Sequence, residues 1–191
     1  MTHSFARHRL AQFVCAAAVA TACTAAPALA SPSSVATRVP AALASHPLRM
    51  AAGGTRTWSP ANGEVTVLHF WASWCAPCRR ELPRIAALER SLAATGGRVL
   101  AVSIDQDIRN AVRFADRVAP GLTVYHDGSE GLARTLDLPA LPWTVVLGRD
   151  GAVVWSGGGS DDATFEAMSG TARRLASTRA IATETTEGSP R

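Results

Sequence analysis

The sequence contains no lysine, a single tyrosine and only four cysteines among its 191 residues. All 19 basic residues are arginine, which excludes catalysis through a Schiff-base lysine and phosphate binding by a P-loop lysine. The dinucleotide-binding pattern GxGxxG and the zinc-protease pattern HExxH are also absent. The formal net charge is +4, and the first 30 residues hold two of the arginines and no acid, which leaves +2 for the rest. Such a mild excess gives no reason to expect a nucleic-acid partner.

The first 30 residues predict a signal peptide. Residues 1–9 are polar and basic, residues 10–22 are apolar and rich in alanine, and Ala28-Leu29-Ala30 supplies the small residues that signal peptidase reads. An uncleaved membrane anchor and lipid attachment at Cys23 are the alternatives. In each case we expect the domain to lie outside the cytoplasm, in the periplasm or a similar compartment.

The rest of the chain divides into a linker, one domain and a tail. Residues 31–46 are rich in Ser, Pro, Ala and Val without a sustained period, which predicts a linker. Residues 47–176 have the length and hydrophobic content of one compact domain. Residues 177–191 are polar and rich in Thr and Glu, which predicts a disordered tail.

Within the domain, the apolar pattern alternates between short strand-like runs and helical spacing. A hairpin is predicted at each end of the domain, and the second one turns at Gly148-Arg149-Asp150-Gly151. This order predicts an α/β fold with a mixed sheet and helices on both faces. The predicted strands are 48–50, 55–58, 65–70, 99–104, 122–125, 143–147 and 152–155, and the predicted helices are 76–95, 107–118, 129–136 and 161–175.

The motif Cys75-Ala76-Pro77-Cys78 follows a predicted strand and opens a predicted helix. The first helical turn brings the two cysteines within reach of a disulfide, and the helix N-terminus stabilises a thiolate. We therefore expect a redox-active disulfide in which Cys75 is the exposed nucleophile and Cys78 the shielded resolving thiol. The alternatives are half of a zinc site, a purely structural disulfide and two inert core thiols.

The segment from Leu68 to Pro83 resembles the active-site strand and helix of the TlpA/ResA-like thioredoxin-fold proteins. The resemblance extends to Leu141-Pro142 and to the Gly-Arg-Asp-Gly hairpin, and covers roughly residues 47–175. It implies a thioredoxin-like three-layer α/β/α fold with an added N-terminal β-hairpin and a central insertion near residues 105–125. It also implies an exported thiol-disulfide oxidoreductase.

The resemblance assigns roles to residues around the cysteines. It implies that Glu81 manages the proton of Cys78, although a solvated Glu in a first helical turn is the plainer interpretation. It implies a cis bond between Leu141 and Pro142, which would lie against the cysteine pair and bind an extended substrate segment together with Trp74.

Two residues depart from the family pattern. His69 replaces the Asp or Asn that usually precedes the cysteines on this strand, and it is either a hydrogen-bonded structural residue or a proton relay. Trp143 replaces the Thr or Ser common after the proline, which puts the substrate groove in doubt. His126, before Asp127-Gly128, is expected to be a surface turn residue.

The function that follows is reduction of protein disulfides, without a resident cofactor or metal. By resemblance, the clients are apocytochrome c thiols or the cysteines of copper sites, and a membrane thiol donor restores the reduced pair. A Cu(I)-binding metallochaperone and a peroxidase of the same fold are the alternatives, since soft thiolates suit Cu(I). The direction of electron flow depends on the reduction potential of Cys75 and Cys78, which composition does not determine.

Overall fold

The computed structural model describes residues 32–127 and 131–184, so the predicted signal peptide lies outside the described residues. Five helices and seven strands follow one another along this part of the chain. The helices are α1 (Pro32–Ser45), α2 (Ala76–Ala93), α3 (Ile108–Val118), α4 (Leu132–Thr135) and α5 (Asp162–Glu184). The strands are β1 (Leu48–Met50), β2 (Thr55–Arg56), β3 (Val65–Trp71), β4 (Gly97–Ser103), β5 (Val124–His126), β6 (Trp143–Leu147) and β7 (Val153–Gly158).

The strands form one mixed sheet in the order β2-β1-β5-β4-β3-β6-β7. Strands β3, β4 and β5 are parallel, whereas on one side of them β6 pairs antiparallel with β3 and β7 pairs antiparallel with β6. The N-terminal hairpin of β1 and β2 joins the other side, antiparallel to β5. The sheet is therefore the mixed one that the order of elements predicts.

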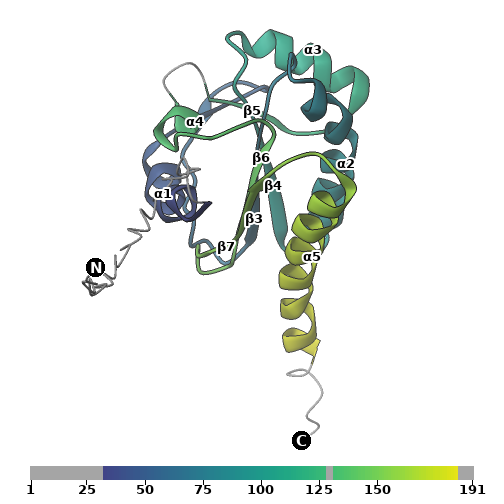
Figure 1. The fold of residues 1–191 in the computed structure, drawn as a ribbon. Coiled ribbons are helices and arrows are strands. Elements are labelled where there is room, and N and C mark those ends of the chain that lie inside the picture. Colours follow the sequence, from purple (N-terminus) through teal and green to yellow (C-terminus); the bar gives the residue numbers. More distant parts are fainter. Residues whose placement is uncertain (1–31, 128–130, 185–191) are drawn as a thin grey trace, which may run out of the picture.

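Helices cover both faces of the sheet, which makes three layers (Figure 1). Side chains of α2, α3 and α5 share one buried cluster with the inward-facing residues of β3 and β4, and a second cluster fills the opposite face beneath α1 and α4. Along β3, Val67 faces the first cluster and Leu68 the second, as the alternation of a strand requires. The predicted three-layer α/β/α fold is confirmed.

The two central strands are buried on both faces, so they read as continuous apolar runs. Every residue of β3 is buried, and β4 has one half-buried residue. Buried parallel strands lack the polar alternation of a half-exposed strand. Helix α2 connects the parallel strands β3 and β4. The cysteine motif therefore lies at the carboxyl end of β3, where the chain leaves the sheet and α2 begins.

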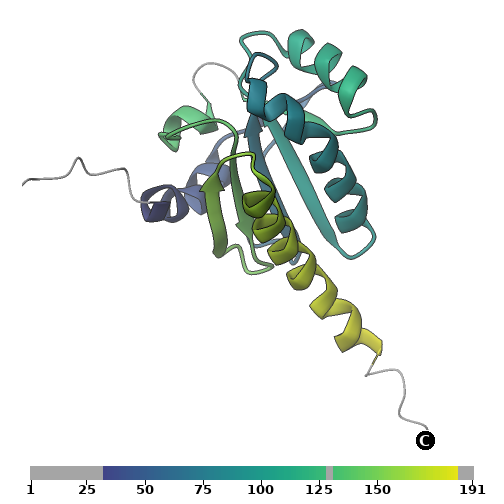
Figure 2. The ribbon, with the colours of Figure 1, turned by 45° about the vertical axis from the view of Figure 1, so that its right-hand side comes forward.

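Two predictions about the ends of the domain are wrong. Most of the predicted linker forms α1, which contacts β7 and α4. Its buried Val35, Val39 and Leu43 pack against this face of the sheet. The last helix also continues to Glu184, into the predicted disordered tail. Figure 2 shows the C-terminal part of α5 running past the sheet; residues 185–191 lie outside the described residues.

The hairpin between β6 and β7 has the predicted turn. The amide of Gly148 donates to the carbonyl of Ala152, and the amide of Gly151 donates back to Gly148. Gly151 has φ +82°, and a Cβ there would come within 2.9 Å of the backbone of Ala61. The turn therefore needs glycine both for its backbone conformation and for the close approach of the neighbouring loop.

Candidate active site

Cys75 and Cys78 form a disulfide across the first turn of α2, with their Cα atoms 5.3 Å apart. Cys75 is the N-cap residue of the helix, with an extended backbone, and its Sγ accepts the amide hydrogen of Cys78 at 3.3 Å. Pro77 occupies the first turn, where a helical residue has no partner for its N–H. The amide donors at this helix end favour negative charge on Cys75 once the disulfide opens.

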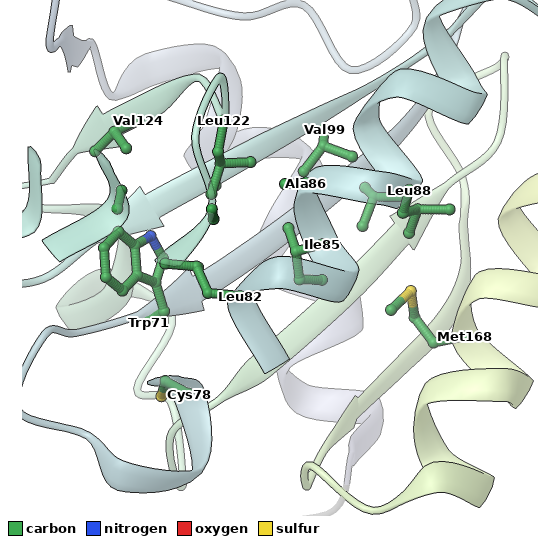
Figure 3. Close-up of a cluster of buried hydrophobic side chains, with 14 of the residues drawn as sticks. Trp71, Cys78, Leu82, Ile85, Ala86, Leu88, Val99, Leu122, Val124 and Met168 are labelled. Carbon is green, nitrogen blue, oxygen red and sulfur yellow. The ribbon is translucent and has the colours of Figure 1, made fainter. Parts of the chain in front are cut away.

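The two sulfurs differ in their access to solvent. Cys78 is fully buried, and Figure 3 shows it at one end of the apolar cluster that contains Trp71 and Leu82. Cys75 is 6% exposed, so it is less accessible than the sequence predicts. It is nevertheless the one of the pair that lines a surface groove, and an incoming sulfur can therefore reach only Cys75 directly.

The groove beside Cys75 has a volume of about 740 Å³ and mostly apolar walls. Its walls come from the motif itself, the end of β4, helix α4 and the segment before β6. Trp74 stands at its edge with 66% of its surface exposed. The residues that line it are Trp74, Cys75, Pro77, Ile104, Ala133, Arg134, Asp137, Leu138, Ala140 and Leu141.

The bond between Leu141 and Pro142 is cis. Leu141 lines the groove, whereas Pro142 is buried behind it and its carbonyl accepts the amide of Gly159 at 3.4 Å. Trp143 does not enter the groove. Its indole is 8% exposed, its Nε1 donates to Ser156 Oγ at 3.2 Å, and a Cβ on Gly158 would lie 2.8 Å from its ring. The glycine therefore makes room for the unusual tryptophan inside the fold.

Glu81 lies one helical turn after Cys78 and is only 3% exposed. Burial raises the pKa of its carboxyl to about 7, with a smaller contribution from the negative charge of Asp161, while the positive charge of Arg84 opposes the rise. Its Oε2 has no hydrogen-bond partner among the described residues. The carboxyl can therefore gain or lose a proton near neutral pH.

His69 is buried in the middle of β3, on the face that α2 and α5 cover. Its Nδ1 forms a hydrogen bond with Thr144 Oγ1 of β6 at 2.8 Å, and its Nε2 has no hydrogen-bond partner among the described residues. Burial lowers the pKa of the imidazole to about 3. The ring is therefore neutral at the pH at which Glu81 titrates, and its hydrogen bond gives it a structural role.

A carboxylate that the sequence did not single out anchors the loop before Cys75. Asp105 is 2% exposed and follows the end of β4. Its side chain accepts hydrogen bonds from the amide of Ser73 at 2.9 Å, from Ser73 Oγ at 2.6 Å and from Ser103 Oγ at 2.8 Å. Its carbonyl accepts from His126 Nε2 at 2.6 Å. The prediction of a surface position for His126 is wrong, since this residue lies on β5 and is 4% exposed.

The family model for Redoxin matches residues 33–173. The chain belongs to the Redoxin family. It is similar to the thiol-disulfide oxidoreductase ResA of Geobacillus thermodenitrificans, with 29% identity over 91 residues, which are 48% of this chain and 52% of that protein. The chain therefore spans about half the length of the curated relatives that it matches.

Solved structures agree with this family. The fold matches a Chlorobium tepidum candidate thiol:disulfide interchange protein DsbE with a TM-score of 0.62 and 28% identity, over 68% of this chain and 92% of that one. A secreted disulfide oxidoreductase of Mycobacterium tuberculosis shares the fold at a TM-score of 0.56 and 20% identity, over 68% and 95% of the two chains. The resemblance to TlpA/ResA-like thioredoxin-fold proteins is confirmed.

This Redoxin-family chain brings four of the six predicted site residues to the groove or the disulfide, namely Trp74, Cys75, Cys78 and Leu141. The substrate contact of Pro142 and the proton transfer by Glu81 stay predictions. Asp105 could have been noticed as the first acid after a long buried run, because polar residues at the carboxyl ends of parallel strands meet at one edge of the sheet.

In the described residues no group of three metal-ligating side chains gathers, and no helix has the length and apolarity to cross a membrane.

Proposed function

We propose that the protein is a thiol-disulfide oxidoreductase that reduces disulfides of other proteins. The observation that carries the proposal is the asymmetric Cys75–Cys78 disulfide at the N-terminus of α2, of which only Cys75 lines the groove. A relative named as a thiol-disulfide oxidoreductase and a similar structure named as a candidate interchange protein support it.

The reaction begins with the reduced pair. The Cys75 thiolate attacks one sulfur of the client disulfide, which forms a mixed disulfide and releases the other client sulfur as a thiolate. Cys78 loses its proton and attacks Cys75 Sγ, which releases the second client thiolate and closes the Cys75–Cys78 disulfide. Two electrons pass from the protein to the client, and the two client thiolates take up two protons.

Glu81 has the position and the pKa to accept the proton of Cys78 in the second step. It lies one turn further along α2, and burial brings its pKa to about 7, which makes its carboxylate a stronger base than that of an exposed Glu. A buried thiol without such a base would ionise with difficulty, because burial penalises the thiolate. We therefore assign Glu81 as the base for Cys78.

We place this activity outside the cytoplasm, and we propose that its clients are disulfides formed by the cysteines of apocytochrome c or of copper sites. The apolar run and small-residue site before residue 31 support export, and the Mycobacterium tuberculosis protein of the same fold is described as secreted. In an oxidising compartment the pair must be reduced again after each turnover, so we propose a membrane thiol donor as the second partner.

Replacement of the resolving thiol tests the mechanism. In a background that lacks Cys15 and Cys23, Cys78→Ser should accumulate a covalent adduct between Cys75 and a client, because the second step cannot follow. The adduct is detected on non-reducing gels and mapped by mass spectrometry. Cys75→Ser is the matched control and should trap nothing. Equal trapping by both variants, or by neither, would contradict the assignment of the two sulfurs.

A further inference from the structure

Four arginines surround the side of the active-site helix that faces away from the groove. Arg79 and Arg80 lie on the first turns of α2, and Arg113 and Arg117 lie on α3. All four side chains are exposed. We call this set the arginine face.

The arginine face is hollowed rather than flat. One hollow of about 310 Å³ is lined by Ser73, Arg79, Asn110, Arg113, Phe114 and Arg117. A second hollow of about 330 Å³ is lined by Ala76, Arg79, Arg80, Phe114 and Val118. Because Arg79 and Phe114 line both, the two hollows adjoin.

No carboxylate of the described residues forms an ion pair with the arginine face, although the charge of Asp107, which pairs with Arg109, also acts on Arg113. The ion pairs in that part of the chain involve Arg84, Arg98 and Arg109 instead. Asp116, the one acidic residue of α3, is exposed and makes none of these pairs.

The four guanidinium groups instead contact neutral partners. Those of Arg79 and Arg117 lie 4.9 and 5.6 Å from the ring centre of Phe114, Arg113 donates to Asn110 Oδ1 at 2.6 Å, and Arg80 donates to a backbone carbonyl at 3.4 Å. Stacking holds a guanidinium plane in place and leaves N–H edges free for carboxylates.

The position of the arginine face relative to the disulfide suggests what it binds. Ser73 and Ala76, which line the hollows, flank Cys75 in the sequence. The apolar groove begins on the other side of the same turn, at Trp74 and Pro77. A polypeptide whose sulfur meets Cys75 can therefore lie in the groove and extend over the arginines.

We propose that the arginine face docks an acidic segment of the protein that exchanges a disulfide with Cys75. The inference rests on the proposed function and adds the chemistry of the partner, namely Asp and Glu side chains near its cysteines. Complementary charge would steer such a partner to the disulfide. An anionic membrane is a poorer match, because no apolar residue of α3 is exposed: Ala111, Phe114 and Ala115 are buried, and Ile108, Val112 and Val118 are half-buried.

Binding of cysteine-free peptides tests the proposal without any thiol chemistry. The probes are two fluorescently labelled peptides of equal length, one rich in Asp and Glu and the other with Asn and Gln at the same positions. The full-length oxidised protein should bind the acidic peptide, and sodium chloride should weaken this binding. Arg113→Gln with Arg117→Gln should weaken it by about fivefold, because two exposed charge pairs are lost. Amide shifts in NMR spectra should centre on Ser73, Arg79 and α3.

The matched control is Arg90→Gln with Arg174→Gln, which removes the same charge from exposed positions at the far end of α2 and on α5. Equal weakening by both double variants, or equal binding of the acidic and neutral peptides, would overturn the proposal. The proposal would also be overturned if the protein bound vesicles of phosphatidylglycerol and phosphatidylcholine more strongly than the acidic peptide and if this binding depended on Arg113 and Arg117. Binding of the acidic peptide by a protein that reduces no peptide disulfide would support docking and refute the proposed activity instead.

Discussion

Glu81 combines burial with a place one turn from Cys78, and this combination makes its protonation state matter to exchange. Burial raises the pKa of its carboxyl to about 7, so the side chain is largely ionised above that pH and protonated below it. Only the ionised form can take a proton from Cys78. The contribution of Glu81 to the resolving step should therefore grow as the pH rises through neutrality.

Glu81→Gln should slow the decay of the mixed disulfide by about a hundredfold above pH 7, which is the lower end of what general bases contribute. The difference from the unchanged protein should shrink a pH unit or more below 7, where Glu81 carries a proton. Stopped-flow measurements of the resolving step over pH provide the two profiles. Glu166→Gln is the control, because this exposed carboxylate also pairs with Arg84. Parallel profiles for the Glu81 variant and the unchanged protein would remove Glu81 from the mechanism.

At the scale of elements, the loop between β3 and α2 is fixed by the carboxylate that follows β4. Asp105 accepts two hydrogen bonds from Ser73 and one from Ser103. This arrangement connects neighbouring parallel strands at the point where the chain turns into the cysteine motif, so the position of Cys75 depends on a residue thirty positions later in the chain. A buried donor that loses its acceptor costs about 1–3 kcal/mol.

Asp105→Asn should therefore lower the free energy of unfolding by about 1–3 kcal/mol, because an amide can accept at one oxygen only and turns a donor toward the others. Hydrogen exchange at the Ser73 amide should become faster, while exchange in β6 should change no more than global stability requires. Urea denaturation and exchange followed by NMR measure the two effects. Asp150→Asn, in the exposed hairpin turn, is the control. Unchanged exchange at Ser73 would show that the loop keeps its position without this carboxylate.

For the whole molecule, the sequence predicts the sheet and the disulfide helix well because both depend on local patterns. The apolar runs of β3 and β4, the period of α2 and the turn before Gly151 are each visible within a few residues. The first helix is hidden by its composition. Val35, Val39 and Leu43 recur at helical spacing, but serines and an internal Pro40 obscure the pattern.

The parts of the site that sequence reasoning missed depend on which strands are neighbours. Asp105, Ser73 and His126 are far apart in the chain and meet because β4 lies between β3 and β5. No local signal gives that order. The inward turn of Trp143 likewise depends on Gly158, which is opposite it on β7. The motif locates the chemistry, whereas the sheet determines its supporting residues.

The stability of the whole fold should depend on pH through two buried groups that act in opposite directions. Burial lowers the pKa of His69 from 6.5 to about 3, so between these values the unfolded chain binds one more proton and stability is lost as the pH falls. Burial raises the pKa of Glu81 from 4.5 to about 7, so between these values the native chain binds one more proton and stability is lost as the pH rises. From about pH 4.5 to 6.5 the two effects should nearly cancel.

Single variants should reveal the two slopes. In that window His69→Asn keeps a hydrogen-bonding group near Thr144 but removes the titration of the imidazole. The free energy of unfolding of this variant, relative to that of the unchanged protein, should fall as the pH rises, by up to about 1.4 kcal/mol per pH unit. Glu81→Gln should make it rise by a similar amount, and the double variant should restore a nearly flat difference. Urea denaturation at several pH values measures all four proteins, and comparison with the unchanged protein removes the effect of other carboxylates. Slopes of the same sign for the two single variants would mean that one of these groups does not titrate as its burial requires.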